Sequence, residues 1–302
     1  MDLLSGMITV GQLGEDALVE RLTGLLRSGD GVVLGPGDDC AVVEGVGEDC
    51  VEVLKTDCLV EGVHYLPEAP GRKVGWKAVA RVISDFAAMG AEPRHLLVTV
   101  ALPPECKVAW VEELYGGMDD CAVRFAAVVV GGETTSLPSG APVLISVAGS
   151  GRVERDAWVP RGGGRPGDGL FVTGRLGGSI TGKHLEFVPR LREARWLVQN
   201  VSVRAMMDLS DGLGKDLPRL AKACACGFVL DREALPCNEG CSAQEAIGDG
   251  EDYELLIAGD IGPDEMGKWA AEFPDLELTR IGELCEGEAV ALEGGWEHFL
   301  KD

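Results

Sequence analysis

The spacing of apolar residues along the chain predicts alternating helices and strands. Apolar residues recur at three- and four-residue intervals over residues 14–27, 73–89 and about 105–123, the spacing of one helix face. Short apolar runs that end in polar turns predict strands at 32–34, 41–43, 51–54, 95–102, 126–130 and 143–148. The first half of the chain is therefore expected to form a mixed α/β domain, with polar loops at the strand ends where ligands commonly bind.

The second half restarts the same kind of pattern after a glycine-rich stretch. Expected here are a strand at 170–173, helical stretches around 178–187 and 190–203, a helix through 220–222, a strand at 253–258, a helix at 263–273 and a C-terminal strand pair. Glycine and arginine accumulate between 149 and 168, which indicates a domain boundary near 150–165. We therefore predict an α/β fold with mixed sheets and two domains, residues 1–150 and 151–302.

The charge of the chain excludes some classes of partner. The 302 residues hold 27 Lys and Arg against 50 Asp and Glu, a formal charge of −23. A nucleic-acid partner and an anionic membrane surface are both disfavoured, because each is bound by an excess of basic residues. The ten cysteines lack zinc-ligand spacing, and neither a leader nor a long apolar stretch is evident. Free thiols in a reducing cytoplasm are expected.

Acidic residues gather at the ends of apolar segments. They occur in Gly37-Asp38-Asp39, Lys55-Thr56-Asp57, Ser84-Asp85, Gly132-Glu133 and Asp208-Leu209-Ser210-Asp211. Repeated carboxylates in such settings suggest convergence on a shared cation, and Mg²⁺ prefers these oxygen ligands and bridges them to nucleotide phosphates. The competing interpretation is that about half of these acids cap helices or turns.

A possible phosphate-binding loop is present in the second half of the chain but is incomplete. Residues 177–183 spell G-x-x-x-x-G-K, yet His184 follows where a P-loop needs Ser or Thr. A glycine-rich helix start is the favoured interpretation. Three further residues each allow two roles. His64 could contact a substrate phosphate or form a hydrogen bond within its loop, and Arg161 could bind phosphate or remain solvated. Trp296 could stack on a ring or belong to the core, which is the default for tryptophan.

Six segments of the chain form one ordered set: residues 35–39, 55–65, 84–91, 131–135, 208–213 and 250–255. They contain the acid clusters and also Val60-Glu61-Gly62-Val63-His64, Ser84-Asp85-Phe86-Ala87-Ala88-Met89-Gly90-Ala91 and Gly250-Glu251-Asp252-Tyr253, and the ending Gly295-Trp296-Glu297 fits too. In this order they resemble thiamine-monophosphate kinases. The V-E-G-V-H segment combined with S-D-x-A-A-M-G-A is highly specific, and the resemblance covers nearly the whole chain. It implies a two-domain fold like that of aminoimidazole ribonucleotide synthetase, with the N-terminal domains pairing in a homodimer.

The resemblance also implies an activity and a set of site residues. The activity is direct, in-line transfer of a phosphoryl group from ATP to thiamine monophosphate, assisted by several Mg²⁺ ions. The implied metal ligands are Asp39, Thr56, Asp57, Asp85, Glu133, Asp208 and Asp211, of which Asp57, Asp85 and Asp211 are expected to be catalytic. The implied nucleotide contacts are Gly132, Glu133, Arg161 and Ser210, and the implied thiamine-phosphate contacts are His64, Glu251 and Trp296.

Two residues depart from the pattern of the family. Lys55 stands where a serine is common, and we hypothesise that its ammonium replaces one metal ion. Glu133 stands where an aspartate is more common, and activity is expected to be retained.

Two other functions compete with this one. One is another activity of the superfamily, such as that of selenophosphate synthetase, formylglycinamidine or aminoimidazole ribonucleotide synthetase, or a hydrogenase-maturation dehydratase. These activities belong to proteins that lack the V-E-G-V-H segment. Selenophosphate synthetase also needs a reactive cysteine or selenocysteine close to an N-terminal lysine, and the first cysteine, Cys40, and the first lysine, Lys55, do not fit that arrangement. The other is a non-catalytic nucleotide- or thiamine-phosphate-binding protein, against which the near-complete set of acids argues.

Overall fold

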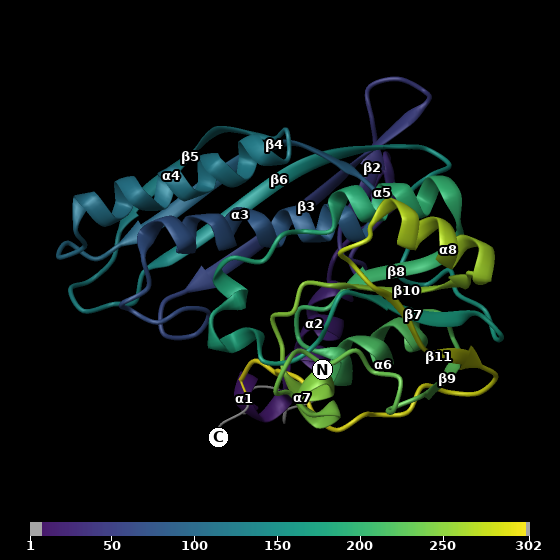
Figure 1. The fold of residues 1–302 in the computed structure, drawn as a ribbon. Coiled ribbons are helices and arrows are strands. Elements are labelled where there is room, and N and C mark those ends of the chain that lie inside the picture. Colours follow the sequence, from purple (N-terminus) through teal and green to yellow (C-terminus); the bar gives the residue numbers. More distant parts are fainter. Residues whose placement is uncertain (1–7, 300–302) are drawn as a thin grey trace.

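The computed structural model of the chain describes residues 8–299 and contains two sheets with helices packed on them (Figure 1). The first sheet is mixed, because β4 and β5 are parallel, whereas the second is antiparallel throughout and not mixed as expected. The first sheet has six strands in the order β1-β2-β3-β6-β4-β5. Their bounds are β1 Val32–Leu34, β2 Ala41–Glu44, β3 Cys50–Val60, β4 Glu92–Leu102, β5 Val128–Ser136 and β6 Leu144–Glu154. Two short helices precede it, α1 Val10–Leu13 and α2 Glu15–Thr23.

Two long helices, α3 (Gly71–Ala88) and α4 (Val108–Arg124), lie along one face of this sheet (Figure 1). Their apolar residues form a common core with alternate residues of β3, β4 and β6. The two helices approach each other closely at Gly75, where an added Cβ would lie 1.9 Å from the carbonyl oxygen of Leu114. Glycine is therefore required at this crossing.

The second sheet has five strands in the order β8-β10-β7-β11-β9. Its strands are β7 Gly169–Thr173, β8 Ser202–Asp208, β9 Gly227–Leu230, β10 Leu255–Asp260 and β11 Leu278–Cys285. One apolar face packs against α5 (Leu191–Asn200) and α8 (Pro263–Glu272), and the other against α6 (Leu213–Ala223) and α7 (Ala243–Gly248). We propose that the domain boundary lies between Glu154 and Gly169, because β6 continues past residue 150 in the first sheet.

Helix α3 joins the two halves of the molecule. Its last residues, Ala87 and Ala88, are fully buried in the core formed by α5, α8 and the second sheet. One turn earlier, Ser84 Oγ donates a hydrogen bond of 2.5 Å to Asp208 Oδ2 at the end of β8. The C-terminal turns of α3 are therefore fixed against both sheets.

Several predicted boundaries are wrong. Strand β3 continues through Lys55, Thr56 and Asp57, which therefore lie within a strand and not after one. Residues 178–187 form two short 3₁₀ turns, η2 Ser179–Thr181 and η3 Lys183–Leu185, where a helix was expected. Among the described residues after Glu277, there is one strand, β11, in place of the predicted pair.

Two further features concern the cysteines and the helices. All ten cysteines are free thiols in the structure. Within residues 8–299, no helix combines the length and the apolar character needed to cross a membrane.

Candidate active site

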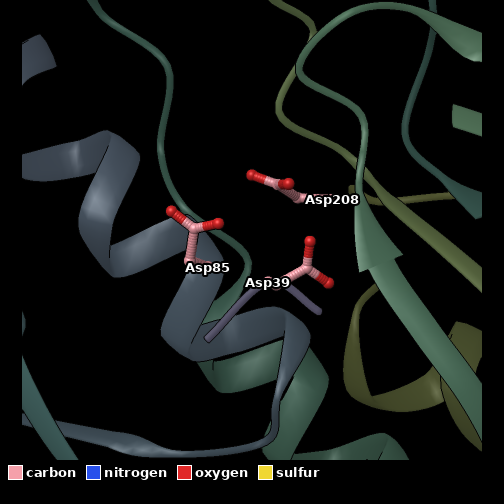
Figure 2. A group of neighbouring side chains, drawn as sticks. All are labelled: Asp39, Asp85 and Asp208. Atoms are coloured by element: carbon pink, nitrogen blue, oxygen red, sulfur yellow. The ribbon is translucent and has the colours of Figure 1, made fainter. Parts of the chain in front are cut away.

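Three carboxylates from distant parts of the chain meet between the two sheets (Figure 2). Asp39 precedes β2, Asp85 lies in the last turn of α3, and Asp208 ends β8. Each offers an oxygen within 4.8 Å of the others, and all three side chains are buried. We call these residues the acid cluster. Burying three carboxylates together is costly unless cations balance them, so the arrangement indicates a cation site.

Two basic side chains already contact the acid cluster. Lys55 Nζ lies 2.6 Å from Asp85 Oδ1, and the Arg161 guanidinium lies 2.5 Å from Asp39 Oδ1. Burial acts to lower the pKa of Lys55, but Asp85 and Asp57 raise it above its usual value, so the ammonium stays charged. Part of the negative charge of the cluster is therefore balanced by the protein itself.

The remaining charge of the cluster is not balanced. Asp39 Oδ2 is buried without a hydrogen-bond partner, and Asp208 is 4% exposed. Burial, together with the charge of Asp39, raises the pKa of Asp208 to about 7. An unpaired carboxylate oxygen in a buried acidic site is the donor that a hard divalent cation requires. The acid cluster therefore fits Mg²⁺.

A pocket of about 250 Å³ opens beside the acid cluster. Its lining includes five of the predicted site residues, His64, Ser210, Asp211, Glu251 and Trp296, together with Arg81, Tyr253 and His298. We call it the aromatic pocket. A larger hollow of about 550 Å³ lies between α6 and residues 287–292, but its lining contains none of the predicted residues.

One buried lysine holds together segments that line the aromatic pocket. Lys77 on α3 is 0% exposed, and its Nζ forms an ion pair with Glu251. The same Nζ lies 2.7 Å from the carbonyl oxygen of His64 and 2.8 Å from Nδ1 of His184. Lys77 therefore joins three separate segments and fixes two of the predicted substrate contacts.

The imidazole of His64 is held in a neutral form. Its Nδ1 accepts a 3.0 Å hydrogen bond from the amide of Val60. Burial first, and then the nearby charge of Arg81, lowers the pKa of His64 to about 4. With Nδ1 occupied as an acceptor, Nε2 carries the proton of the ring and is a hydrogen-bond donor.

The loop after β8 places Ser210 and Asp211 in the pocket lining. Gly212 has φ of +97°, a conformation that favours glycine, and it begins α6. The Asp211 carboxylate pairs with Arg219 at 2.5 Å, and its carbonyl oxygen accepts a hydrogen bond from the amide of Trp296. Asp211 therefore lies on the pocket side and not within the acid cluster.

Other predicted residues lie away from the acid cluster. Thr56 points to the opposite face of the first sheet from Asp57 and lies 3.4 Å from Ser146 Oγ. Gly132 and Glu133 lie in the exposed edge strand β5, and β6 and β4 separate that strand from β3. Asp57 lies on the cluster side, 3.5 Å from Arg81.

The sequence interpretation missed several basic and polar residues of the site. Lys77, Arg81 and Ser84 all lie on α3 near Asp85, and His184 lies in the turn after the incomplete P-loop motif. A signal was present, because Lys77, Arg81 and Asp85 are spaced four residues apart within a helix that is otherwise largely apolar. Charged residues at that interval on a buried face require partners.

Two family domains match the chain and define its class. Residues 37–153 match the AIR synthase related protein N-terminal domain, and residues 165–295 match the AIR synthase related protein C-terminal domain. The fold therefore belongs to the class of AIR synthase related proteins.

Individual relatives narrow the class. The thiamine-monophosphate kinase of Rhodopirellula baltica is 34% identical over 287 residues, which cover 89% of each chain. That of Mycobacterium tuberculosis is 33% identical and covers 96% of this chain and 93% of its own. A solved structure described as AaThiL complexed with AMPPCP and TMP has a TM-score of 0.84 at 30% identity, covering 97% of this chain and 99% of that chain. The chain belongs to the thiamine-monophosphate kinase family, as the six sequence segments predicted.

Proposed function

We propose that the protein transfers the terminal phosphoryl group of ATP to thiamine monophosphate, giving thiamine diphosphate and ADP. The observation that carries the proposal is the acid cluster beside the aromatic pocket, at the junction of the two sheets. A solved relative is described as bound to AMPPCP and TMP, an ATP analogue and the monophosphate. A cytoplasmic location, where ATP is available, is part of this proposal.

Asp39, Asp85 and Asp208 are the residues that would hold Mg²⁺, and Asp57 is a direct neighbour of Asp85. A bound Mg²⁺ neutralises phosphate charge and favours the in-line arrangement that phosphoryl transfer needs. The protein itself has little covalent chemistry to perform. The acceptor is a phosphate monoester whose oxygen is already anionic near neutral pH, so no general base is required.

The aromatic pocket suits the thiamine part of the substrate. Trp296 is 51% exposed at the pocket, and its indole can lie against the cationic thiazolium ring. Glu251 offers a carboxylate, and His64 offers its Nε2 proton. Ser210 and Arg161 are the residues that we propose contact ATP on the side of the second sheet, and Gly132 and Glu133 on the side of β5.

Lys55 supports the hypothesis of a built-in cation. Its ammonium lies 2.6 Å from Asp85, within the space where a further metal ion would balance the same carboxylate. We propose that the protein binds one Mg²⁺ fewer than it would with a serine at this position. Mg²⁺ titration by calorimetry should therefore give a higher stoichiometry for Lys55→Ser than for the unaltered protein, and equal stoichiometries would reject the proposal.

We also propose a homodimer formed by the first sheets. Strand β5 is an edge strand whose residues are almost all exposed, and Val128 and Val130 are each 57% exposed. Unpaired edge strands with apolar residues are sites of strand pairing between chains. Sedimentation equilibrium should give twice the chain mass of 31.9 kDa.

One assay tests the activity. Purified protein is incubated with Mg²⁺, ATP and thiamine monophosphate, and thiamine diphosphate and ADP are quantified together. Equal amounts of both products are expected, and none without Mg²⁺. Nucleotide binding without ADP release would instead indicate a non-catalytic binding protein.

A further inference from the structure

Arg81 lies where the acid cluster meets the aromatic pocket. It is on α3, one turn after Lys77 and one turn before Asp85. Among the described residues that line the pocket, it is the single lysine or arginine. Its guanidinium approaches Asp57 on the cluster side, and its neighbours on the pocket side are Glu251 and Tyr253.

The donors of Arg81 are incompletely used. One terminal nitrogen donates to the carbonyl oxygen of Cys58 at 3.1 Å, and the other lies 3.5 Å from Asp57, beyond the distance of a strong charged hydrogen bond. Its Nε is buried without a hydrogen-bond partner. A guanidinium carries five N–H donors, so several donors of Arg81 remain available to a ligand.

Arg190 shows what a purely structural arginine looks like in the same protein. Its Nε and a terminal nitrogen both lie 2.6 Å from the two carboxylate oxygens of Glu254. That pair is closed and bidentate. Arg81 makes a single, longer contact with Asp57 by comparison. An arginine that binds an anionic ligand is expected to keep donors unpaired in this way.

The acidic residues of the pocket already have partners of their own. Glu251 pairs with Lys77, Asp211 pairs with Arg219, and Asp249 accepts a 2.7 Å hydrogen bond from the amide of Gly178. An anion entering the pocket therefore finds Arg81 as its basic partner. The planar fork of a guanidinium fits two oxygens of a phosphate group at once.

We propose that Arg81 binds the phosphate of the monophosphate substrate and directs it from the aromatic pocket toward the acid cluster. The inference rests on the proposed function and deepens it, because it assigns the residue that distinguishes thiamine monophosphate from unphosphorylated thiamine. Arg81 is then a specificity-determining contact, and the ring system of thiamine is bound independently of it.

Calorimetric binding of two probes tests the proposal on the full-length protein in Mg²⁺ with a non-hydrolysable ATP analogue. The probes are thiamine monophosphate and thiamine. Arg81→Met should weaken binding of the monophosphate by about 30- to 100-fold, because it removes charge-assisted hydrogen bonds to phosphate. Binding of thiamine should change less than about twofold, and Arg81→Lys should recover part of the loss.

The matched control is Arg72→Met on the same helix, whose side chain pairs with Asp120 at the surface. It should leave both affinities unchanged. Equal loss for the two probes, or no loss for the monophosphate, overturns the assignment of Arg81. Should Arg81→Met fail to fold by circular dichroism, Arg81→Lys decides alone, and unaltered affinity for the monophosphate overturns the assignment. If the unaltered protein does not bind thiamine monophosphate, the proposed function itself fails.

Discussion

The acid cluster and the aromatic pocket lie side by side, but they differ in how far their buried charges are paired. In the cluster, Asp39 keeps a buried oxygen without a partner, and the pKa of Asp208 is raised to about 7. In the pocket, Glu251 is paired with Lys77, and burial holds His64 neutral. The acid cluster keeps an excess of negative charge beyond what Lys55 and Arg161 balance, whereas the acids Glu251 and Asp211 of the pocket are each paired with a basic residue.

This difference separates two tasks of a phosphoryl-transfer site. A region with excess negative charge binds cations and the phosphates they carry, so its structure depends on what is bound. A region whose acids are paired by its own residues is organised before the substrate arrives, which lowers the entropic cost of binding. Helix α3 carries residues of both regions, Lys77 for the pocket and Asp85 for the cluster. The comparison can be tested by substituting residues of one region while leaving the other region unchanged.

The largest effect is expected from Asp85→Asn, which removes charge from the acid cluster. Turnover should fall by about 1,000-fold or more, because the site loses a charge that positions the phosphates. Calorimetric affinity for Mg²⁺ should fall as well, while thiamine binding should persist. Asp119→Asn on the exposed face of α4 is the control and should behave like the unaltered protein. Undiminished Mg²⁺ affinity in Asp85→Asn would remove Asp85 from the set of metal ligands.

The next effect concerns the pocket. Lys77→Met leaves Glu251 buried without its cation, so the free energy of unfolding should fall by about 3 kcal/mol. The KM for thiamine monophosphate should rise by about tenfold while the KM for ATP stays the same, because Glu251 and the His64 backbone lose their common anchor. Denaturant titration and steady-state kinetics measure the two quantities.

The control for this prediction is one turn away. Lys73→Met removes an exposed ion pair with Glu186, which contributes at most about 1 kcal/mol. If Lys77→Met raises both KM values together, the pocket is not organised separately from the nucleotide site.

The sequence predicts much of this architecture because the local signals are strong. Helix α3 and strand β4 follow apolar periodicity, and both were expected close to their observed bounds. The extension of β3 through Lys55 and Asp57 could not be predicted from the local sequence, because polar residues after an apolar run usually mark the end of a strand. Their place in a strand is set by pairing with β6, which continues from Cys50 to Val60. Residues 178–187 form 3₁₀ turns because positive φ values at Gly177, Gly178 and Gly182 interrupt any helix.

The sequence predicted which residues could bind a metal ion, but it did not predict which of them lie together. The residues Asp39, Asp85 and Asp208 were each expected as metal ligands, and they lie together. Nothing in the sequence showed that Thr56 and Asp57 point to opposite faces, since that requires the true extent of β3. Lys77 and Arg81 were missed because their partners, Glu251 and Asp57, lie in other elements. Such pairs form only on folding.

A smaller effect is expected at Glu133 in the edge strand β5, because this residue lies away from the acid cluster. Glu133→Ala should weaken Mg²⁺-ATP binding by about tenfold, because it removes one carboxylate from the proposed nucleotide contacts. Glu133→Asp should retain activity, since the carboxylate is kept. The matched control is Glu105→Ala at an exposed turn near β5, which should leave nucleotide affinity unchanged. Unchanged affinity in Glu133→Ala would confine the nucleotide contacts to the other predicted residues.

The smallest effect is a pH dependence of stability that belongs to the pocket. The pKa of His64 is about 4 in the folded protein and about 6.5 in an unfolded chain, so the unfolded state binds the proton more tightly. The stabilisation is therefore fully present above pH 6.5 and is lost as the pH falls toward 4. Because the ring is partly exposed, we expect a loss of about 1 kcal/mol. Urea titrations at pH 7 and pH 4.5 should show a smaller difference for His64→Gln than for the unaltered protein. Equal differences would mean that His64 is not held neutral by the pocket, and the contrast with the acid cluster would then rest on the Lys77–Glu251 pair.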